Sequence, residues 1–114
     1  MIVAYAFALP IPAGQTEAVR RFTEECLGPR RAEFDDMMRR SGLTEESYWV
    51  QRDPARGDQL VVFGREDLAA FNAIMANPQT AFDSWYRDQF TTIMGFDPTA
   101  DPGTPNEWLG TWTA

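Results

Sequence analysis

Two amide side chains lie where the sequence pattern otherwise places apolar residues on a helix face. Asn72 falls between Leu68 and Met75, and Gln89 falls within an apolar stripe of a later helix. A buried polar group needs a hydrogen-bond partner, so an amide at such a position can hold a carbonyl or phenolate oxygen of a ligand. The alternative is that each amide bonds to nearby backbone or to ordered water.

Aromatic side chains accompany these amides and predict the walls of a cavity between a sheet and its helices. The candidates are Tyr48, Trp49, Trp85 and Tyr86. Aromatic walls with a few converging polar groups are typical of small-molecule pockets. The alternative for all four is packing in a core or in a subunit interface.

A charged pair lies near the inward face of the first long helix. Arg30 and Glu33 are three residues apart, which places them side by side on a helix. They are candidates for the ligand pocket, and the alternative is a structural or surface ion pair.

Several chemistries are excluded by residues that the chain lacks. Its ten basic residues are all arginine, so Schiff-base chemistry on lysine is absent. It has no histidine, which removes imidazole bases, histidine metal ligands and haem axial ligands. The single cysteine, Cys26, cannot form an internal disulfide, and the carboxylates show no calcium-loop spacing. We therefore expect no cofactor and no metal.

The elements that would position these residues follow from periodicity and turn chemistry. Strands are predicted over 2–9, 46–52, 58–65 and 107–114, and helices over 14–41, 67–77 and 78–94. Gly28-Pro29 is expected to kink or break the first helix, and Gly42 and Gly95 are expected to end helices. Asn77 followed by Pro78 predicts the start of the last helix, and residues 97–106 predict a loop.

The two central strands are expected to form a hairpin. A symmetric register places Glu46 opposite Arg65 and Tyr48 opposite Phe63, which are favourable cross-strand pairs.

This order of elements predicts one α+β domain over 1–114 with the ferredoxin-like βαββαβ topology. Its antiparallel sheet would carry the helices on one face. The predicted strands are apolar on both faces, so the second face also needs a cover. A second sheet packed against it makes a homodimer, and a different protein partner on that face is the other solution.

In the order of its elements and in its sequence patterns, the chain resembles the dimeric α+β barrel superfamily over residues 2–97. The likeness is carried by Pro12-Ala13-Gly14, the long helix, EESYWVQ and QLVVFGRED. Within that superfamily, RRAEFDDMMRRSGLTEESYWVQ with its short hairpin is similar to a small bacterial family of unknown function.

The resemblance implies a ferredoxin-like monomer and a sheet-to-sheet dimer. Superfamily members include haem proteins that use a histidine, which this chain lacks, and cofactor-independent monooxygenases, which remain compatible with it. The leading hypothesis is a pocket for a small apolar or aromatic molecule, with oxygenation as the reaction if the protein is catalytic. The alternative is a non-catalytic dimeric or partner-binding module of the stress-responsive type.

Charge and hydropathy exclude two further classes of partner. The net charge of −7 repels nucleic acid, because phosphate neutralisation requires a basic surface. No apolar run approaches the roughly 18 residues of a membrane span, and the N-terminal run lacks a cationic start. We therefore expect a cytoplasmic protein.

Overall fold

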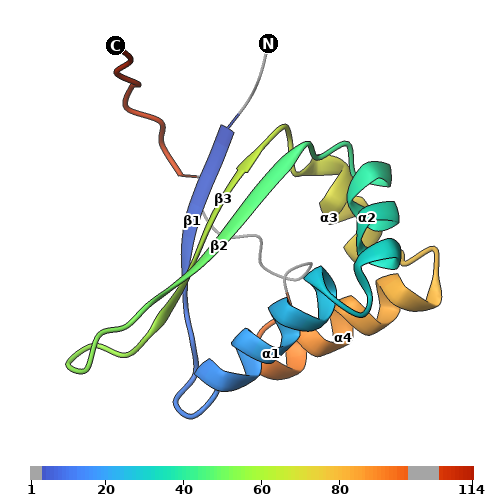
Figure 1. Cartoon of the computed structure of the whole chain (residues 1–114), viewed down its shortest axis with the longest axis horizontal. Helices are drawn as coiled ribbons and strands as arrows, with labels where there is room; N and C mark the ends of the chain where they lie inside the picture. Colours follow the sequence, from blue (N-terminus) through green and yellow to red (C-terminus); the bar gives the residue numbers. More distant parts are fainter. Residues whose placement is uncertain (1–3, 98–105) are drawn as a thin grey trace.

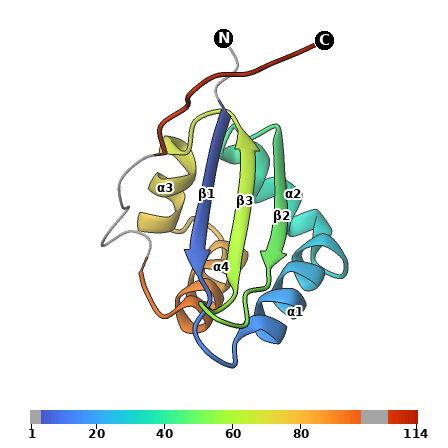
Figure 2. The same cartoon turned by 90° about the vertical axis from the view of Figure 1, so that its left-hand side faces the viewer.

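The computed structural model describes residues 4–97 and 106–114, and it shows an α+β architecture (Figure 1). The elements in chain order are β1 (Ala4–Pro10), α1 (Thr16–Leu27), α2 (Arg31–Arg40), β2 (Glu45–Gln51), β3 (Gln59–Arg65), α3 (Ala69–Ala76) and α4 (Ala81–Met94). The strands form an antiparallel sheet in the order β1-β3-β2. All the labelled helices lie on one face of this sheet, as expected, and no described helix or strand covers the opposite face, which we call the uncovered face (Figure 2).

The long helical segment breaks where the sequence predicts it. Helix α1 ends at Leu27 and α2 begins at Arg31, with Gly28 and Pro29 between them. A side chain at Gly28 would come within 2.9 Å of the Glu24 carbonyl oxygen, so the tight turn requires glycine there. The break lets both halves of the segment contribute to one core, in which Cys26 and Phe34 are buried.

The start of the last helix differs from the prediction. Its N-cap is Thr80 rather than Asn77, and Pro78 lies before the helix. The Thr80 hydroxyl accepts a hydrogen bond from the Asp83 backbone NH, and the Asp83 carboxylate accepts one from the Thr80 NH. This reciprocal capping box satisfies two helix-end donors, which a cap at Asn77 could not match.

The central hairpin also differs from the prediction, by a shift of one residue. Glu45 pairs with Arg65 and Tyr48 with Val62, so Glu46 and Phe63 are not the partners of Arg65 and Tyr48. The turn determines this register, because the Asp53 side chain accepts hydrogen bonds from the NH groups of residues 55 and 56. Since side chains alternate between faces, the shift places Phe63 on the uncovered face rather than beside Tyr48.

The predicted edge strand over 107–114 is wrong. Residues 106–114 have no regular secondary structure, so the described chain leaves β1 as an unpaired edge. Trp108, Leu109 and Trp112 are 73%, 90% and 85% exposed. The weak alternation of this short segment includes Gly110 and does not suffice for strand pairing. Most of the predicted 97–106 loop lies outside the described residues.

The core lies between the sheet and the helices in two adjoining parts. One lies among the helices around Phe34, Met37 and Phe82, and the other joins the sheet to α1 and α4 through Leu60 and Val62. Tyr48 contacts both parts. The inward residues of β3 are thus buried and those of β1 and β2 are partly buried, while Trp49 on the other face is 55% exposed.

Candidate functional site

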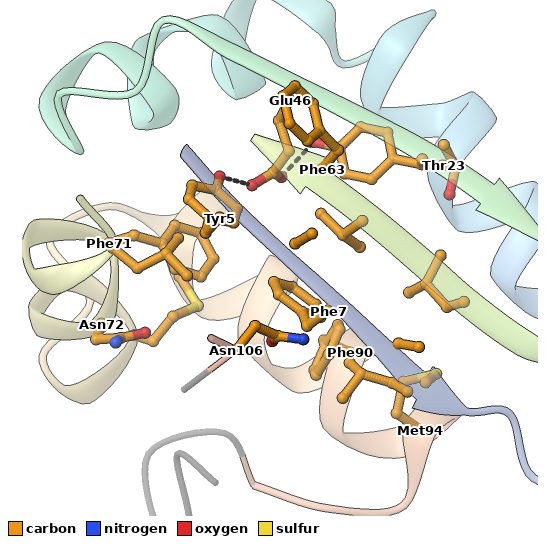
Figure 3. A pocket seen from close by; sticks show the side chains of 18 of the residues that line it. Tyr5, Phe7, Thr23, Glu46, Phe63, Phe71, Asn72, Phe90, Met94 and Asn106 are labelled. Atoms are coloured by element: carbon orange, nitrogen blue, oxygen red, sulfur yellow. Dashed lines mark hydrogen bonds between the residues drawn. The ribbon is translucent and has the colours of Figure 1, made fainter. Parts of the chain in front are cut away.

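A cavity of about 1160 Å³ lies between the inner face of the sheet and helices α1, α3 and α4. Its apolar wall includes Phe7, Phe71, Phe90 and Met94 (Figure 3). The cavity extends around the unpaired edge of β1, because the outward-facing Ala4, Ala6 and Ala8 line it as well. The exposed segment 106–109 lines the cavity as well.

A carboxylate with two tyrosines forms the polar part of this wall. Tyr5 on β1 donates a hydrogen bond to Oε2 of Glu46, and Tyr48 on β2 donates one to Oε1 at 2.6 Å (Figure 3). The side chains come from the two outer strands of the sheet, which β3 separates.

Gly64 makes this contact across the sheet possible. It is the register partner of both Tyr5 and Glu46, so it lies directly between them on β3. A Cβ atom at Gly64 would be 2.1 Å from the Tyr5 ring, which therefore rests on the bare backbone. Glycine inside a strand often marks such a close approach.

Burial controls the ionisation of the groups at this wall. Loss of water raises the pKa of Glu46, and the hydrogen bonds from Tyr48 and Tyr5 oppose that rise only in part. Burial, with hydrogen bonding to Glu46 and its charge, raises the pKa of Tyr5 and Tyr48 well above the usual tyrosine range. Burial raises the pKa of the nearby Cys26 thiol to about 12. The tyrosines and the thiol are therefore neutral near pH 7.

Tyr86 on α4 adds a polar group without a partner. Its side chain is only 8% exposed and lines the cavity, and Phe22 and Phe34 pack against its ring at centroid distances of 5.1 and 5.9 Å. The described residues offer its hydroxyl no hydrogen-bond partner. No buried side-chain nitrogen or oxygen of the described residues lacks a partner, so this hydroxyl is reached from the cavity and is available to a molecule there.

The charges along the cavity are all negative. Its described lining includes the carboxylates Glu46, Asp67 and Glu107 and contains no arginine. Arg31 and Arg39 lie on a smaller groove on the other side of Glu46. No described ion pair joins either of them to Glu46, and Arg31 pairs with Asp35 at 2.8 Å.

Three of the residues predicted from the sequence lie at this cavity. Tyr48 and Tyr86 line it as expected, and Asn72 lines it from an exposed position on α3. Gln89 is partly buried on α4 outside the described lining. Asn72 and Gln89 therefore do not converge on one point.

The two tryptophans predicted as cavity walls lie elsewhere. Trp49 points to the uncovered face, because it neighbours the inward-facing Tyr48 on a strand. Trp85 packs against Phe22 and Phe82 at centroid distances of 5.5 and 5.4 Å, in the core rather than in the cavity lining.

The Arg30–Glu33 pair is the surface ion pair of the alternative interpretation. The guanidinium Nε lies 3.1 Å from the carboxylate. The guanidinium also stacks over Trp85, 4.1 Å from the ring centroid. These contacts tie the start of α2 to α4, and neither residue lines the cavity.

Sequence reasoning did not find Tyr5 and Glu46 as site residues. Glu46 was expected to pair with Arg65, and Tyr5 was one of several large residues in an apolar strand. The available signal was Gly64, an isolated glycine within the strand QLVVFGR, which marks a close approach by another group.

No protein-family model, curated protein or solved structure matches this chain. Within residues 4–97 and 106–114, no group of three or more His, Cys, Asp or Glu side chains could hold a metal ion. No helix in the same ranges has the length and apolar character needed to cross a membrane. The interpretation of the cavity therefore rests on its own geometry.

Proposed function

We propose that this protein binds a small molecule with an apolar or aromatic body in the cavity between sheet and helices. The observation that carries the proposal is the Tyr86 hydroxyl, which opens onto the cavity and has no hydrogen-bond partner among the described residues. The apolar walls would take the body of the ligand, and the tyrosines with Glu46 would take its polar group.

The support is stronger for binding than for oxygenation. The predicted oxygen-holding amides were Asn72 and Gln89, and only Asn72 lines the cavity. The polar groups that do converge are Tyr5, Glu46 and Tyr48. We therefore propose a binding site and assign no reaction to it.

The binding proposal can be tested with Nile red, a neutral dye whose fluorescence increases in apolar surroundings. Asn72→Trp places a large ring at the exposed α3 side of the cavity, and we expect it to weaken dye binding about tenfold or more. Ala73→Trp is the matched control, because Ala73 is exposed on the same helix but does not line the cavity. Absence of dye binding to the wild type, or equal binding by both variants, would contradict the proposal.

A second proposal concerns assembly, and the uncovered sheet face favours it. We propose a ferredoxin-like arrangement lacking its fourth strand, assembled as a dimeric α+β barrel through this face. The order β1-β3-β2 supports the arrangement, and the exposed Trp49 with Val61 and Phe63 supplies the apolar surface. If binding to the cavity fails, this dimeric module is the function that the remaining observations favour.

A further inference from the structure

We infer that the cavity is built for an organic cation, an amine on an apolar body whose ammonium group lies against Glu46. This inference rests on the proposed binding function and specifies the chemical class of the ligand. It is carried by the charges around the cavity, by the unused acceptors at its polar wall and by its aromatic lining.

The charges disfavour an anionic ligand. The described lining holds three carboxylates, Glu46, Asp67 and Glu107, and no arginine. The whole chain carries a net charge of −7, so the surrounding potential has the same sign. A carboxylate or phosphate ligand would meet repulsion at every charged position of the lining, whereas a cation would be attracted.

Glu46 has no ion-pair partner in the part of the chain that the structure describes. It is the carboxylate that shares its oxygens with two tyrosine hydroxyls, and no ion pair to it occurs among the described residues. A partly buried carboxylate without a cation carries an uncompensated desolvation cost. An ammonium group in the cavity would supply the missing charge.

The free hydrogen-bonding positions at the polar wall are mainly acceptors, so they favour a ligand that brings donors. Both tyrosine hydrogens already point to Glu46, so the oxygens of Tyr5 and Tyr48 retain only acceptor capacity. The carboxylate also keeps free lone pairs, and the Tyr86 hydroxyl is unpartnered among the described residues. An ammonium group has three donors and no acceptor, which matches this set better than a carbonyl group.

Aromatic rings complete the match. Tyr5 and Phe7 stack with their centroids 6.1 Å apart on the sheet side, and Phe71 and Tyr86 meet edge to face at 6.1 Å on the helix side. All four line the cavity. The negative faces of such rings attract ammonium groups, most strongly where water is excluded.

The experiment compares three probes that share one body: 4-phenylbutylamine, 4-phenylbutan-1-ol and 4-phenylbutyrate. Their affinities for the wild-type chain are measured by isothermal titration calorimetry at pH 7.5, where the amine is charged. We expect the amine to bind about tenfold tighter than the alcohol, and the carboxylate to bind weakest. This ranking requires no variant, so it does not depend on whether a substituted chain folds.

Two variants then assign the preference to one carboxylate. Glu46→Gln should weaken amine binding about tenfold while changing alcohol binding less than about twofold. Glu45→Gln is the matched control, because Glu45 is the preceding residue on β2 but pairs with Arg65 outside the cavity. It should leave all three affinities unchanged.

The possible failures are distinguishable. If the alcohol binds as tightly as the amine, or if Glu46→Gln weakens both equally, the cation inference is overturned while the binding proposal stands. If Glu45→Gln has the same effect as Glu46→Gln, the preference reflects general charge, and the inference is again overturned. If neither these probes nor Nile red bind, the proposed function fails and the inference fails with it.

Discussion

Tyr5 reaches Glu46 across an entire strand, by laying its ring over Gly64. The three residues stand in register on β1, β3 and β2, and the hydrogen bond exists only because the middle residue has no side chain. The strand order β1-β3-β2 therefore brings Tyr5 and Glu46 together at the polar wall of the cavity.

Gly64→Ala should displace the Tyr5 ring, because its new Cβ would lie 2.1 Å from the ring. We expect a loss of about 1–3 kcal/mol in the free energy of unfolding, the usual cost of overpacking. Urea denaturation followed by circular dichroism measures it. In a Tyr5→Ala background the same substitution should cost much less. Equal costs in both backgrounds would show that the ring and the glycine are not coupled.

Glu46 should make the folded state less stable as the pH rises. Burial raises its pKa above the ordinary 4.5, so the folded state binds its proton more tightly than the unfolded chain does. The stabilisation by this proton is present below the unfolded pKa and is lost as the pH rises through the folded pKa. The stability of Glu46→Gln relative to wild type should therefore increase from about pH 4 to pH 7.

Urea denaturation at several pH values checks this trend. Three tyrosines that interact electrostatically with Glu46, namely Tyr5, Tyr48 and Tyr86, have raised pKa values and stay neutral in this window. Glu45→Gln is the matched control, because it removes the exposed carboxylate of the preceding residue, which pairs with Arg65. A flat difference between Glu46→Gln and wild type would contradict the raised pKa of the partly buried Glu46.

Asp83→Ala should be the most destabilising single change in the helical layer. Asp83 is 0% exposed, pairs with Arg40 at 2.8 Å and accepts backbone hydrogen bonds at the start of α4. Removing it leaves Arg40 without its buried partner and the NH groups of Gln79 and Thr80 without their acceptor, at a cost of about 3–5 kcal/mol. Thermal and urea unfolding measure this loss.

Asp36→Ala provides the comparison for that prediction. Asp36 pairs with the same arginine at 2.9 Å, but its side chain is 61% exposed. We expect a change of about 0.5 kcal/mol or less, because exposed pairs contribute little. Similar losses for both variants would mean that burial does not determine the strength of the Arg40 pairs.

Trp49→Glu should disrupt the proposed dimer. A carboxylate in the middle of two facing sheets would be desolvated without a partner. Light scattering after size exclusion should show a dimer for the wild type and a monomer for this variant. Trp112→Glu tests the exposed C-terminal segment in the same way and should preserve the dimer if the sheet face alone forms it. A monomeric wild type would exclude the barrel assembly.

Local chemistry made several elements predictable from the sequence. Gly28-Pro29 predicts a kink or a break in a helix, because proline lacks an NH and clashes with the preceding turn. The Gly42 and Gly95 helix ends are confirmed by positive φ angles of 72° and 78°. The strands around Tyr48 and Val62 were recognisable because both are rich in β-branched and aromatic residues.

The candidate site was only partly predictable, and the errors share a cause. Tyr48, Tyr86 and Asn72 were found from local patterns, whereas Trp49 was assigned to the wrong face. Which parity of a strand faces inward depends on its partners, and a shift of one residue in the hairpin reverses it. The predicted edge strand at 107–114 is wrong for a related reason. A strand must pair with a neighbouring strand, and the composition of a segment does not show whether a neighbour lies beside it.

The sequence by itself determined where the first long helix breaks, which segments form the three strands of the sheet and which chemistries the missing histidine and lysine exclude. These properties depend on side chains and on backbone conformation within a few residues. Only the tertiary structure decided that Tyr5, Glu46 and Tyr86 line one cavity and that Glu46 lacks a cation there. Burial and charge pairing arise between residues that are distant in the chain, so they exist only once the strands and helices are packed.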